Sequence, residues 1–208
     1  MGSPKALLPY RGHAFLEHLL EITRAAASAF AASPPSGISQ WKSPGIGITR
    51  VVLGAHADQI SDALTLAPEI VVRNPHWQQG QLSSIQAAIR SLPDGQTDGP
   101  SDGPTDGIIL FLVDHPLISA TLVNRIVAEF YRSGRPVIVP TLRGKRGHPV
   151  IFGAPLYGEL LGAPADQGAR AVLWAHAAEV LEVPTDEEGV LLNLNDPDTM
   201  HRVMGPDY

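Results

Sequence analysis

The stretch GIILFLV at residues 107–113, followed directly by DHPLIS at residues 114–119, indicates the fold. A continuous apolar run of this length is typical of a parallel strand that helices cover on both faces. In open sheets of such strands, ligands bind beyond the carboxyl ends of the strands. Asp114 is therefore expected at an edge where a carboxylate can hold Mg²⁺ and let the metal bind substrate phosphates. The aspartate could equally cap the next helix or turn, so this stretch alone leaves both interpretations open.

Helical and strand patterns alternate along the chain on either side of this strand. Apolar residues at three- and four-residue spacing predict helices at 14–32, 58–64, 82–92 and 122–131. Runs of β-branched and apolar residues predict strands at 48–54, 69–73 and 135–140. Such alternation predicts an α/β fold with a mostly parallel sheet and right-handed crossovers. The 208 residues are enough for one substantial core, so we expect a single domain over residues 1–208.

Two segments between these elements have the composition of loops. Residues 33–47, SPPSGISQWKSPGIG, are rich in Pro, Gly and Ser, which interrupt regular structure. Residues 93–107, PDGQTDGPSDGPTDG, repeat a tetrapeptide close to Thr-Asp-Gly-Pro and offer no apolar side chain to build a core. The repeated aspartates could form a calcium loop, but repeated turn residues are more typical of a mobile surface insertion. We therefore predict flexible loops at both segments.

Composition excludes several classes of function. The chain has no cysteine, which excludes disulfides, thiolate metal sites and cysteine nucleophiles. Its net charge of −6 argues against a nucleic-acid partner, because affinity for the phosphate backbone comes from clustered Lys and Arg. No apolar run is long enough to span a bilayer, and the first residues lack the apolar core of a signal peptide. We expect a cytoplasmic protein that acts on small molecules and binds neither nucleic acid nor membrane.

Residues 74–85, NPHWQQGQLSSI, lead from a strand into a helix through Gly80. Ser83 and Ser84 would lie in the first turn of that helix, where free backbone N–H groups and hydroxyls can bind a base, ribose or phosphate. Ordinary capping of the helix, with Trp77 as a packing anchor, explains the same residues equally well. Spacing alone does not decide between the two interpretations.

Three further segments carry groups suited to anionic substrates. RGKRGHPVIF at residues 143–152 places basic side chains and His148 before another strand; they could complement an anion or form a solvated hairpin tip. Arg170 follows Asp166 in DQGARAVLW and could make a bidentate contact to phosphate, although an exposed helix arginine is the plainer interpretation. Asp196, in LLNLNDPDT, could be a simple turn residue. Two carboxylates that follow two strands could also converge on one metal ion.

The order of these motifs along the chain is more specific than any one of them. MGSPKALLPYRG, NPHWQQGQLSSI, LVDHPLIS, RGHPVIF, DQGARAVL and LNLNDPDT occur in the order seen in one family. Over nearly its whole length apart from the two loops, the chain resembles the molybdenum cofactor cytidylyltransferase-like nucleotidyltransferases, relatives of the molybdopterin guanylyltransferases. The combination of GHPV with GAR is closer to the cytidylyl and purine-catabolism branch than to the guanylyl branch.

The resemblance implies a three-layer, Rossmann-like nucleotidyltransferase fold with a mostly parallel sheet. It implies transfer of CMP, or another NMP, from an NTP such as CTP to a phosphorylated pterin cofactor of the molybdopterin type, with release of pyrophosphate. The product would serve molybdenum cofactor maturation, with a molybdoenzyme of the xanthine dehydrogenase type as a possible recipient. Gly80, Ser83 and Ser84 would lie along the base or ribose of the nucleotide.

The same resemblance, carried over motif by motif, implies roles for five more residues. Lys5 would neutralise charge on the triphosphate and, with Asp114, would form the catalytic pair. Asp114 and Asp196 would hold Mg²⁺. His148 and Arg170 would face the phosphate of the pterin substrate. Such a reaction depends on charge neutralisation and in-line positioning more than on covalent catalysis by the protein.

The chain departs from the family pattern at its start. Family members usually begin with an apolar strand and a loop of the type Leu-Ala-Ala-Gly-x-Ser-x-Arg-Met-Gly, whereas this chain opens at the Met-Gly. Absence of an interior strand would leave two unpaired edges and remove apolar burial. We therefore expect the natural gene product to start upstream of Met1. For the chain as printed, we expect weak NTP binding and disorder or rearrangement over residues 1–12.

Two alternative functions remain open at this point. One is a sugar-phosphate nucleotidyltransferase of similar fold, against which the segments RGHPV and DQGAR speak. The other is a non-catalytic maturation factor that binds the cofactor or a molybdoenzyme without transferring a nucleotide. A change in melting temperature with Mg-CTP would favour the enzyme over the binding factor, because a ligand of the folded state stabilises it.

Overall fold

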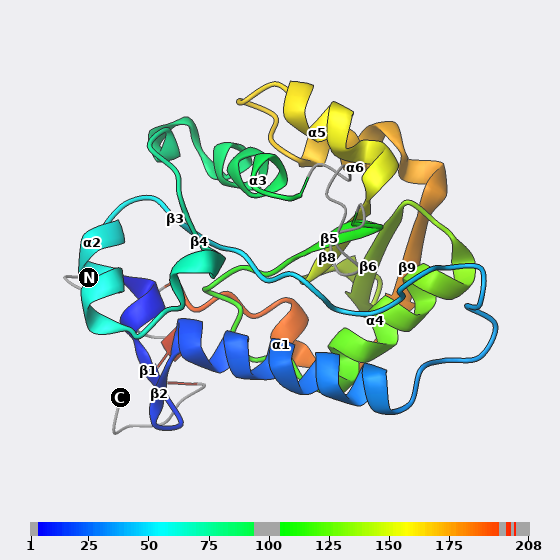
Figure 1. The fold of residues 1–208 in the computed structure, drawn as a ribbon, viewed down its shortest axis with the longest axis horizontal. Coiled ribbons are helices and arrows are strands. Elements are labelled where there is room, and N and C mark those ends of the chain that lie inside the picture. The colour runs from blue at the N-terminus through cyan, green and yellow to red at the C-terminus, as the bar shows by residue number, and fades with distance from the viewer. Residues whose placement is uncertain (1–3, 94–104, 196–198, 201, 203–208) are drawn as a thin grey trace.

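The computed structural model describes residues 4–93, 105–195, 199, 200 and 202, in which helices and strands alternate along most of the chain (Figure 1). The helices are α1 (Phe15–Ala32), α2 (Ala57–Ala63), α3 (Gln81–Arg90), α4 (Ala120–Ser133), α5 (Tyr157–Gly162) and α6 (Arg170–Ala175). The strands are β1 (Pro9–Tyr10), β2 (His13–Ala14), β3 (Val51–Leu53), β4 (Val71–Arg73), β5 (Gly107–Leu110), β6 (Val137–Leu142), β7 (Lys145–Arg146), β8 (Val150–Gly153) and β9 (Val180–Pro184). Within this part of the chain, no helix combines the length and hydropathy that crossing a membrane requires.

The helices predicted from periodicity are present, with ends that differ by a few residues, and local capping explains their limits. At the start of α1, the Ala14 N–H donates to Glu17 Oε2 at 2.9 Å. α4 begins after Ser119, whose Oγ accepts from the Leu122 N–H at 3.0 Å. The same helix ends at Gly134, which has a φ of +63° and so adopts the left-handed conformation that commonly terminates helices.

The main sheet combines parallel and antiparallel pairs. β8 lies between β5 and β6 and is antiparallel to both, β9 is parallel to β6, and the short β7 forms a hairpin with β6. Two successive antiparallel steps leave β5, β6 and β9 running in one direction, which confirms the mostly parallel character of the sheet. The reversed β8 was not predicted from the sequence. It follows from the connection at residues 143–149, which is too short for the helical crossover that a parallel neighbour needs.

Helices cover both faces of this sheet, which confirms the three-layer α/β architecture. Figure 1 shows α1 and α4 along one side and α3, α5 and α6 along the other. Side chains of β6 alternate between the two layers, as the pleat of a strand requires. Ile138 belongs to the buried cluster that contains Ile126 of α4, whereas Val137 and Val139 belong to the cluster that contains Leu160 of α5.

β3 and β4 form a separate parallel pair, placed apart from the main sheet in Figure 1. Their buried side chains, Val51 and Leu53, pack with Leu20 of α1 and Ile60 of α2. A cavity of about 1100 Å³ separates β3 from β5 and is lined by both strands. Because β5 borders this cavity along one edge, the apolar run at residues 107–113 is only half-buried, although its side chains pack into the clusters on both faces of the sheet, as predicted. Regular strand structure also ends earlier than predicted, at Leu110.

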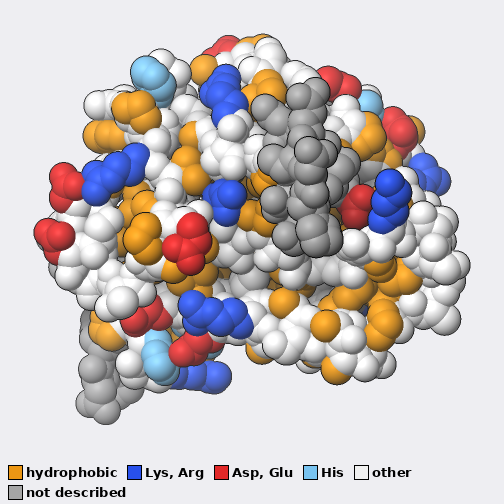
Figure 2. Space-filling view, viewed as in Figure 1, with side chains coloured by type: hydrophobic (Ala, Val, Ile, Leu, Met, Phe, Trp, Pro, Cys, Tyr) orange, Lys and Arg blue, Asp and Glu red, His pale blue; other side chains and the backbone are white. Residues whose placement is uncertain are grey.

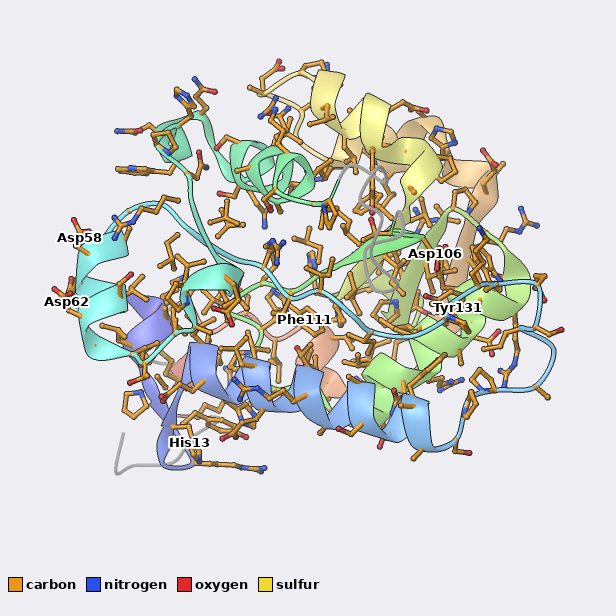
Figure 3. All side chains as sticks on the ribbon, in the orientation of Figure 1. His13, Asp58, Asp62, Asp106, Phe111 and Tyr131 are labelled. Carbon is orange, nitrogen blue, oxygen red and sulfur yellow. The ribbon has the colours of Figure 1, made fainter. Side chains whose placement is uncertain are left out.

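Residues 33–47 lack regular secondary structure, as predicted, but they are anchored to α4 by specific contacts. The Trp41 indole N–H donates to the Tyr131 carbonyl at 3.0 Å, and the Gly45 N–H donates to the Tyr131 hydroxyl at 3.1 Å. That hydroxyl lies 3.2 Å from the Gly45 carbonyl and 3.3 Å from Asp106 Oδ2, and Figure 3 shows Asp106 and Tyr131 side by side. The first predicted loop is therefore docked on the core through one tyrosine.

Two other expectations meet the limits of the described residues. Residues 94–104, most of the second predicted loop, lie outside them, as do residues 1–3. Residues 4–12, for which disorder was expected, contain a 3₁₀ turn at Lys5–Leu7 and strand β1. β1 pairs with β2 in an antiparallel hairpin. The expectation of disorder is therefore wrong for residues 4–12.

Candidate active site

An ion pair joins the start of the chain to its middle. It lies just after the apolar run at residues 107–113, the run that contains β5. Lys5 Nζ donates to Asp114 Oδ2 at 3.4 Å, across 109 positions of sequence. The two side chains are 33% and 20% exposed, so the pair is open to a ligand. Ion pairs with this exposure contribute only about 0–1 kcal/mol to stability. Both charges can therefore be redirected to a charged substrate at small cost to the fold.

The backbone of Asp114 is fixed by two hydrogen bonds that surround it. The His115 N–H donates to the Leu112 carbonyl at 3.0 Å, which forms a turn directly after the apolar run. The Leu194 N–H donates to the Asp114 carbonyl at 2.8 Å and so brings the second predicted acidic segment to this site. Asp196 itself lies outside the described residues. Its pairing with Asp114 at one metal ion stays a prediction.

Two imidazoles, from buried His115 and half-buried His148, lie next to Asp114. The rings of His115 and His148 have centroids 5.2 Å apart, and the Nδ1 atom of each is buried without a hydrogen-bond partner. Burial lowers the pKa of His115, and burial together with the neighbouring His115 lowers the pKa of His148 to about 4, although Asp114 acts in the opposite direction on both. Both rings are therefore neutral at pH 7, and the Nδ1 atom of each is an unused hydrogen-bond donor or acceptor, according to its tautomer.

Close backbone packing holds His148 in this position. The His148 N–H donates to the Val190 carbonyl at 2.9 Å. A Cβ on Gly147 would collide with that same carbonyl, and a Cβ on Gly189 would collide with the carbonyl of Leu117. Gly147 is therefore needed because its chain segment packs closely against Val190. The GHP motif thus contacts the segment that leads to Leu194.

The segment after β4 is organised by Asn74, a residue that is only 3% exposed. Its Nδ2 donates to Ser83 Oγ at 2.8 Å and to Ser84 Oγ at 3.0 Å, while its Oδ1 accepts from the His76 N–H at 2.9 Å. Ser83 Oγ also donates to the Gly80 carbonyl at 2.8 Å. The hydroxyl of Ser83 is thus engaged on both sides, although no side chain caps α3, whereas Ser84 lines the large cavity next to β3.

Arg170 lies apart from these residues. Its guanidinium carbon is 5.8 Å from the centroid of the Trp174 ring, and Trp174 is 60% exposed, so both belong to the outer surface of α6. Within the described part of the chain, no hydrogen bond or ion pair joins Arg170 to Lys5, Asp114 or His148. The helix begins at Arg170 itself.

The basic residues before His148 form a solvated hairpin tip. Arg143 and Gly144 have φ values of 50° and 75°, the left-handed pair of a two-residue turn, and connect β6 to β7. Arg146 is paired with Glu182 of β9 at 2.8 Å. On the face drawn in Figure 2, basic and acidic side chains are interspersed across the described surface. The hairpin interpretation of the RGKR segment is therefore confirmed.

The donor set beside β5 suits a divalent cation that also contacts a ligand. No three His, Cys, Asp or Glu side chains among the described residues are grouped closely enough to hold a metal ion by themselves. Asp114 is one half-buried carboxylate with an orphaned imidazole nitrogen next to it. Mg²⁺ commonly takes one or two carboxylates and completes its shell with water and substrate phosphates, so this set fits a metal that arrives with a nucleotide.

Sequence reasoning found Lys5, Asp114 and His148 but missed Asn74 and His115. Asn74 follows the strand predicted at 69–73, the same kind of position that drew attention to Asp114, so a signal for it existed. His115 directly follows Asp114, but its contact with His148 depends on packing between distant segments. Spacing within either segment could not reveal that contact.

Comparison with known proteins adds three likenesses. Nicotine blue oxidoreductase of Paenarthrobacter nicotinovorans is 28% identical over 177 residues, which cover 82% of this chain and 72% of that protein. The structure of Rv0371c from Mycobacterium tuberculosis H37Rv has a TM-score of 0.72 at 22% identity, and the match covers 98% of this chain and 90% of the Rv0371c chain. A structure of Rv0371c in complex with manganese has a TM-score of 0.65. Molybdopterin-guanine dinucleotide biosynthesis protein A from Archaeoglobus fulgidus has a TM-score of 0.60 at 16% identity, covering 98% of this chain and 90% of its own.

The fold, the ion pair at the carboxyl end of the apolar run and the family comparison agree. A family model described as "MobA-like NTP transferase domain" matches residues 1–180. Among the structural relatives, the likeness extends over nearly the whole chain and shows a shared Rossmann-like architecture. The chain therefore belongs to the MobA-like NTP transferase domain family and is a nucleotidyltransferase.

Proposed function

We propose that the protein transfers a nucleoside monophosphate, with CTP as the preferred donor, to a phosphorylated pterin cofactor of the molybdopterin type. An oxygen of the acceptor phosphate forms a new bond to the α-phosphorus of the NTP. The bond between the α-phosphorus and the bridging oxygen to the β-phosphorus breaks, and pyrophosphate leaves. The proposal of a pterin acceptor is supported by the GHPV and GAR motifs and by the name of the Archaeoglobus fulgidus relative.

The observation that carries the proposal is the contact between Lys5 and Asp114 at 3.4 Å. The reaction requires a cation near the triphosphate and a carboxylate at the carboxyl end of a strand, and the chain brings both together from distant positions. Lys5 would leave Asp114 and bind the phosphates when the NTP arrives. Mg²⁺ held by Asp114, with Asp196 as the proposed second ligand, would supply further neutralisation of the triphosphate charge.

The nucleoside is assigned to the start of α3. Gly80 has a φ of +93° and opens this ten-residue helix, whose first N–H groups have no partner further back in the helix. The Ser83 hydroxyl is already engaged by Asn74 and Gly80, and we therefore assign the direct polar contact to Ser84. The buried amide of Asn74 would position this turn without touching the nucleotide.

The acceptor phosphate is assigned to the opposite side of Asp114. His148 lies beside Asp114, and its Nδ1 has no hydrogen-bond partner; in the tautomer that carries the proton on Nδ1, the ring would donate to an oxygen of the acceptor phosphate. Arg170 is proposed for the acceptor side on the family resemblance, although in the structure it lies apart from His148 on the outer surface of α6. A molybdoenzyme of the xanthine dehydrogenase type is the proposed recipient of the product.

Calorimetric titration of Mg-CTP into the protein tests the proposal, together with release of pyrophosphate in the presence of pterin phosphates or sugar phosphates. Lys5→Met is expected to weaken CTP binding at least tenfold, about 1.4 kcal/mol. Asp114→Asn is expected to abolish turnover while leaving the protein folded. Lys145→Met removes an equal charge from the exposed hairpin tip and is the matched control, with an expected change in affinity below about twofold.

The outcomes separate the alternatives. No response of the wild-type protein to any NTP would refute the enzyme and favour a binding factor. Turnover with sugar phosphates but not with pterins would reassign the acceptor. Equal effects of Lys5→Met and Lys145→Met would remove the ion pair from the site. Redox turnover without pyrophosphate release would point to the activity named for the Paenarthrobacter relative.

A further inference from the structure

Two segments of the candidate site lie side by side and run in opposite directions. One is the loop at residues 114–119, which begins with Asp114; the other is the segment at residues 187–194. At one end, the Leu194 N–H donates to the Asp114 carbonyl at 2.8 Å. In the middle, Gly189 lies so close to the Leu117 carbonyl that a Cβ would not fit between them. The position of the loop is therefore set by the segment that packs along it.

The other end of this pairing is closed by the side chain of Glu187. Its Oε2 accepts from the Ser119 N–H at 3.0 Å, and its Oε1 accepts from the Ser119 hydroxyl at 2.6 Å. Hydrogen bonds to an ionised carboxylate are shorter and about twice as strong as neutral ones. Glu187 is half-buried, so salt and water screen this contact less than they screen an exposed pair. The carboxylate also lies at the start of α4, where the helix dipole favours a negative charge.

The backbone of Glu187 is itself held in place. Its N–H donates to Thr185 Oγ1 at 3.2 Å, and its carbonyl accepts from the Val190 N–H at 3.3 Å. The Thr185 N–H donates to the carbonyl of Thr141 in β6 at 2.8 Å. The carboxylate that holds Ser119 is therefore carried by a segment fixed to the main sheet.

The loop depends on such outside contacts because it has no regular structure of its own. Residues 111–119 connect β5 to α4 without a helix or a strand. The segment at residues 187–194 also holds the second side of the site, since the Val190 carbonyl accepts from the His148 N–H at 2.9 Å. The same segment therefore fixes both Asp114 and His148, and the distance between them depends on its contact with the loop.

We propose that Glu187 is a positioning residue for nucleotidyl transfer. By holding Ser119 with both carboxylate oxygens, it keeps the 114–119 loop against the 187–194 segment and so fixes Asp114 relative to His148. This inference rests on the proposed function, in which Asp114 acts on the triphosphate and His148 faces the acceptor phosphate. Glu187 acts through the loop and touches neither substrate. Reactions that depend on in-line positioning can lose about a hundredfold in rate when a group moves by about 1 Å.

A purely structural role for Glu187 makes a different prediction. The Ser119 hydroxyl accepts from the Leu122 N–H at 3.0 Å and caps α4, so Glu187 could serve only to orient that cap. Loss of the carboxylate would then loosen the start of α4 and leave Asp114 in place. The Leu194 amide separates the two roles, because its acceptor is the Asp114 carbonyl at the far end of the loop.

Glu187→Gln tests the proposal, because glutamine keeps the shape of the side chain but loses the charge and one of the two acceptors. We expect kcat to fall at least tenfold, while the Kd for Mg-CTP changes by less than about threefold, since Lys5 and the start of α3 are untouched. Hydrogen exchange of the Leu194 amide, followed by NMR, should become at least tenfold faster.

Glu188→Gln is the matched control. Glu188 is the next residue along the chain, its side chain is 68% exposed, and its nearest cation is Arg143 at 4.0 Å. We expect less than a twofold change in kcat, in Kd and in exchange of the Leu194 amide. Glu187→Asp is the second variant, to be used if Glu187→Gln does not fold. It keeps the charge but is one methylene shorter, so it can hold only one of the two Ser119 groups, and kcat should fall by less than in Glu187→Gln.

The outcomes decide between the two roles. Faster exchange at Leu122, with exchange at Leu194 and kcat unchanged, would reduce Glu187 to a cap of α4 and overturn the proposal. Equal losses of kcat in Glu187→Gln and Glu188→Gln would assign the effect to net charge and also overturn it. If the wild-type protein shows no turnover with any NTP, the proposed function fails. Exchange of the Leu194 amide then decides by itself whether Glu187 holds the loop, and an unchanged rate would refute it.

Discussion

The hydroxyl of Tyr131 is the main polar link between the 33–47 segment and α4, so Tyr131→Phe tests how that segment is held. The tyrosine is 4% exposed, and its hydroxyl accepts from the Gly45 N–H at 3.1 Å. The same hydroxyl is within hydrogen-bond distance of the Gly45 carbonyl and of Asp106. Phenylalanine keeps the ring and its packing, so the substitution removes polar contacts without creating a large cavity.

The expected loss follows from the partners that are left behind. A buried donor without an acceptor costs about 1–3 kcal/mol, and here the Gly45 N–H loses its acceptor while Asp106 loses a donor. We therefore expect Tyr131→Phe to lower the free energy of unfolding by about 2 kcal/mol. For a chain of this length, the corresponding fall in melting temperature is roughly 4–8 °C.

The pH dependence of the same variant provides a second measurement. Burial raises the pKa of Tyr131 to about 12, whereas a tyrosine in the unfolded chain titrates near 10. Because the unfolded state loses the proton first, the contribution of Tyr131 is complete below pH 10 and is lost as the pH rises toward 12. The difference in unfolding free energy between wild type and Tyr131→Phe should therefore shrink above pH 10.

Urea denaturation followed by tryptophan fluorescence measures these effects, and limited proteolysis of residues 33–47 reports on the segment itself. Tyr157→Phe is the matched control, because its hydroxyl has one side-chain partner, Thr105 Oγ1 at 2.9 Å. We expect a loss of about 0.5–1.5 kcal/mol for the control. The reasoning is refuted if Tyr131→Phe costs no more than Tyr157→Phe, or if proteolysis of the segment is unchanged.

Three further predictions concern other parts of the chain. Burial lowers the pKa of His148 to about 4, so the stabilising contribution of the neutral ring is complete above pH 6.5 and is lost as the pH falls toward 4. The free energy of unfolding should therefore decline less steeply with acid in His148→Gln than in the wild-type protein. An NMR titration that gives His148 an ordinary imidazole pKa would contradict this. Gly189→Ala should destabilise the protein by about 1–3 kcal/mol or more, because the new Cβ meets the Leu117 carbonyl. A Cβ on Gly158 in α5 meets nothing within 4 Å, so Gly158→Ala should stabilise the protein slightly. Urea denaturation of the two variants in parallel measures both effects. Arg170→Ala should raise the KM for the pterin acceptor with a melting temperature near that of wild type; an unchanged KM would take Arg170 out of the acceptor site.

The sequence was sufficient to predict most elements of the fold because they depend on local periodicity. α1 and α4 carry long apolar stripes, which predicted both helices with ends that differ by only one or two residues. The direction of β8 did not follow, because it depends on how few residues separate it from β6. The incomplete burial of β5 could not be predicted either. A cavity borders one edge of this strand, and an apolar run gives no information about what lies beside it.

The candidate site was predictable to the extent that single strand ends pointed to it. Asp114 could be identified from its place after an apolar run, and the resemblance contributed Lys5 before any contact between the two was known. The engaged state of Ser83 could not be read from spacing, because it depends on the buried amide of Asn74 from another segment. The anchoring of residues 33–47 was hidden for the same reason: Trp41 and Gly45 find their partner 86 to 90 positions further along the chain.

The hydrogen bond from the Leu194 N–H to the Asp114 carbonyl has a consequence for synthesis of the protein. Lys5, Asp114, His148 and Leu194 come from four widely separated parts of the chain, so their arrangement cannot be completed until nearly the last residue has left the ribosome. At about 5–20 residues per second, Leu194 is added roughly 10–40 s after translation begins. During that interval the nascent chain can form α1 and the elements near it, but it carries an unfinished phosphate site. Premature termination before Leu194 should therefore yield a chain that contains Lys5 and Asp114 yet lacks the backbone contact that fixes the carboxylate.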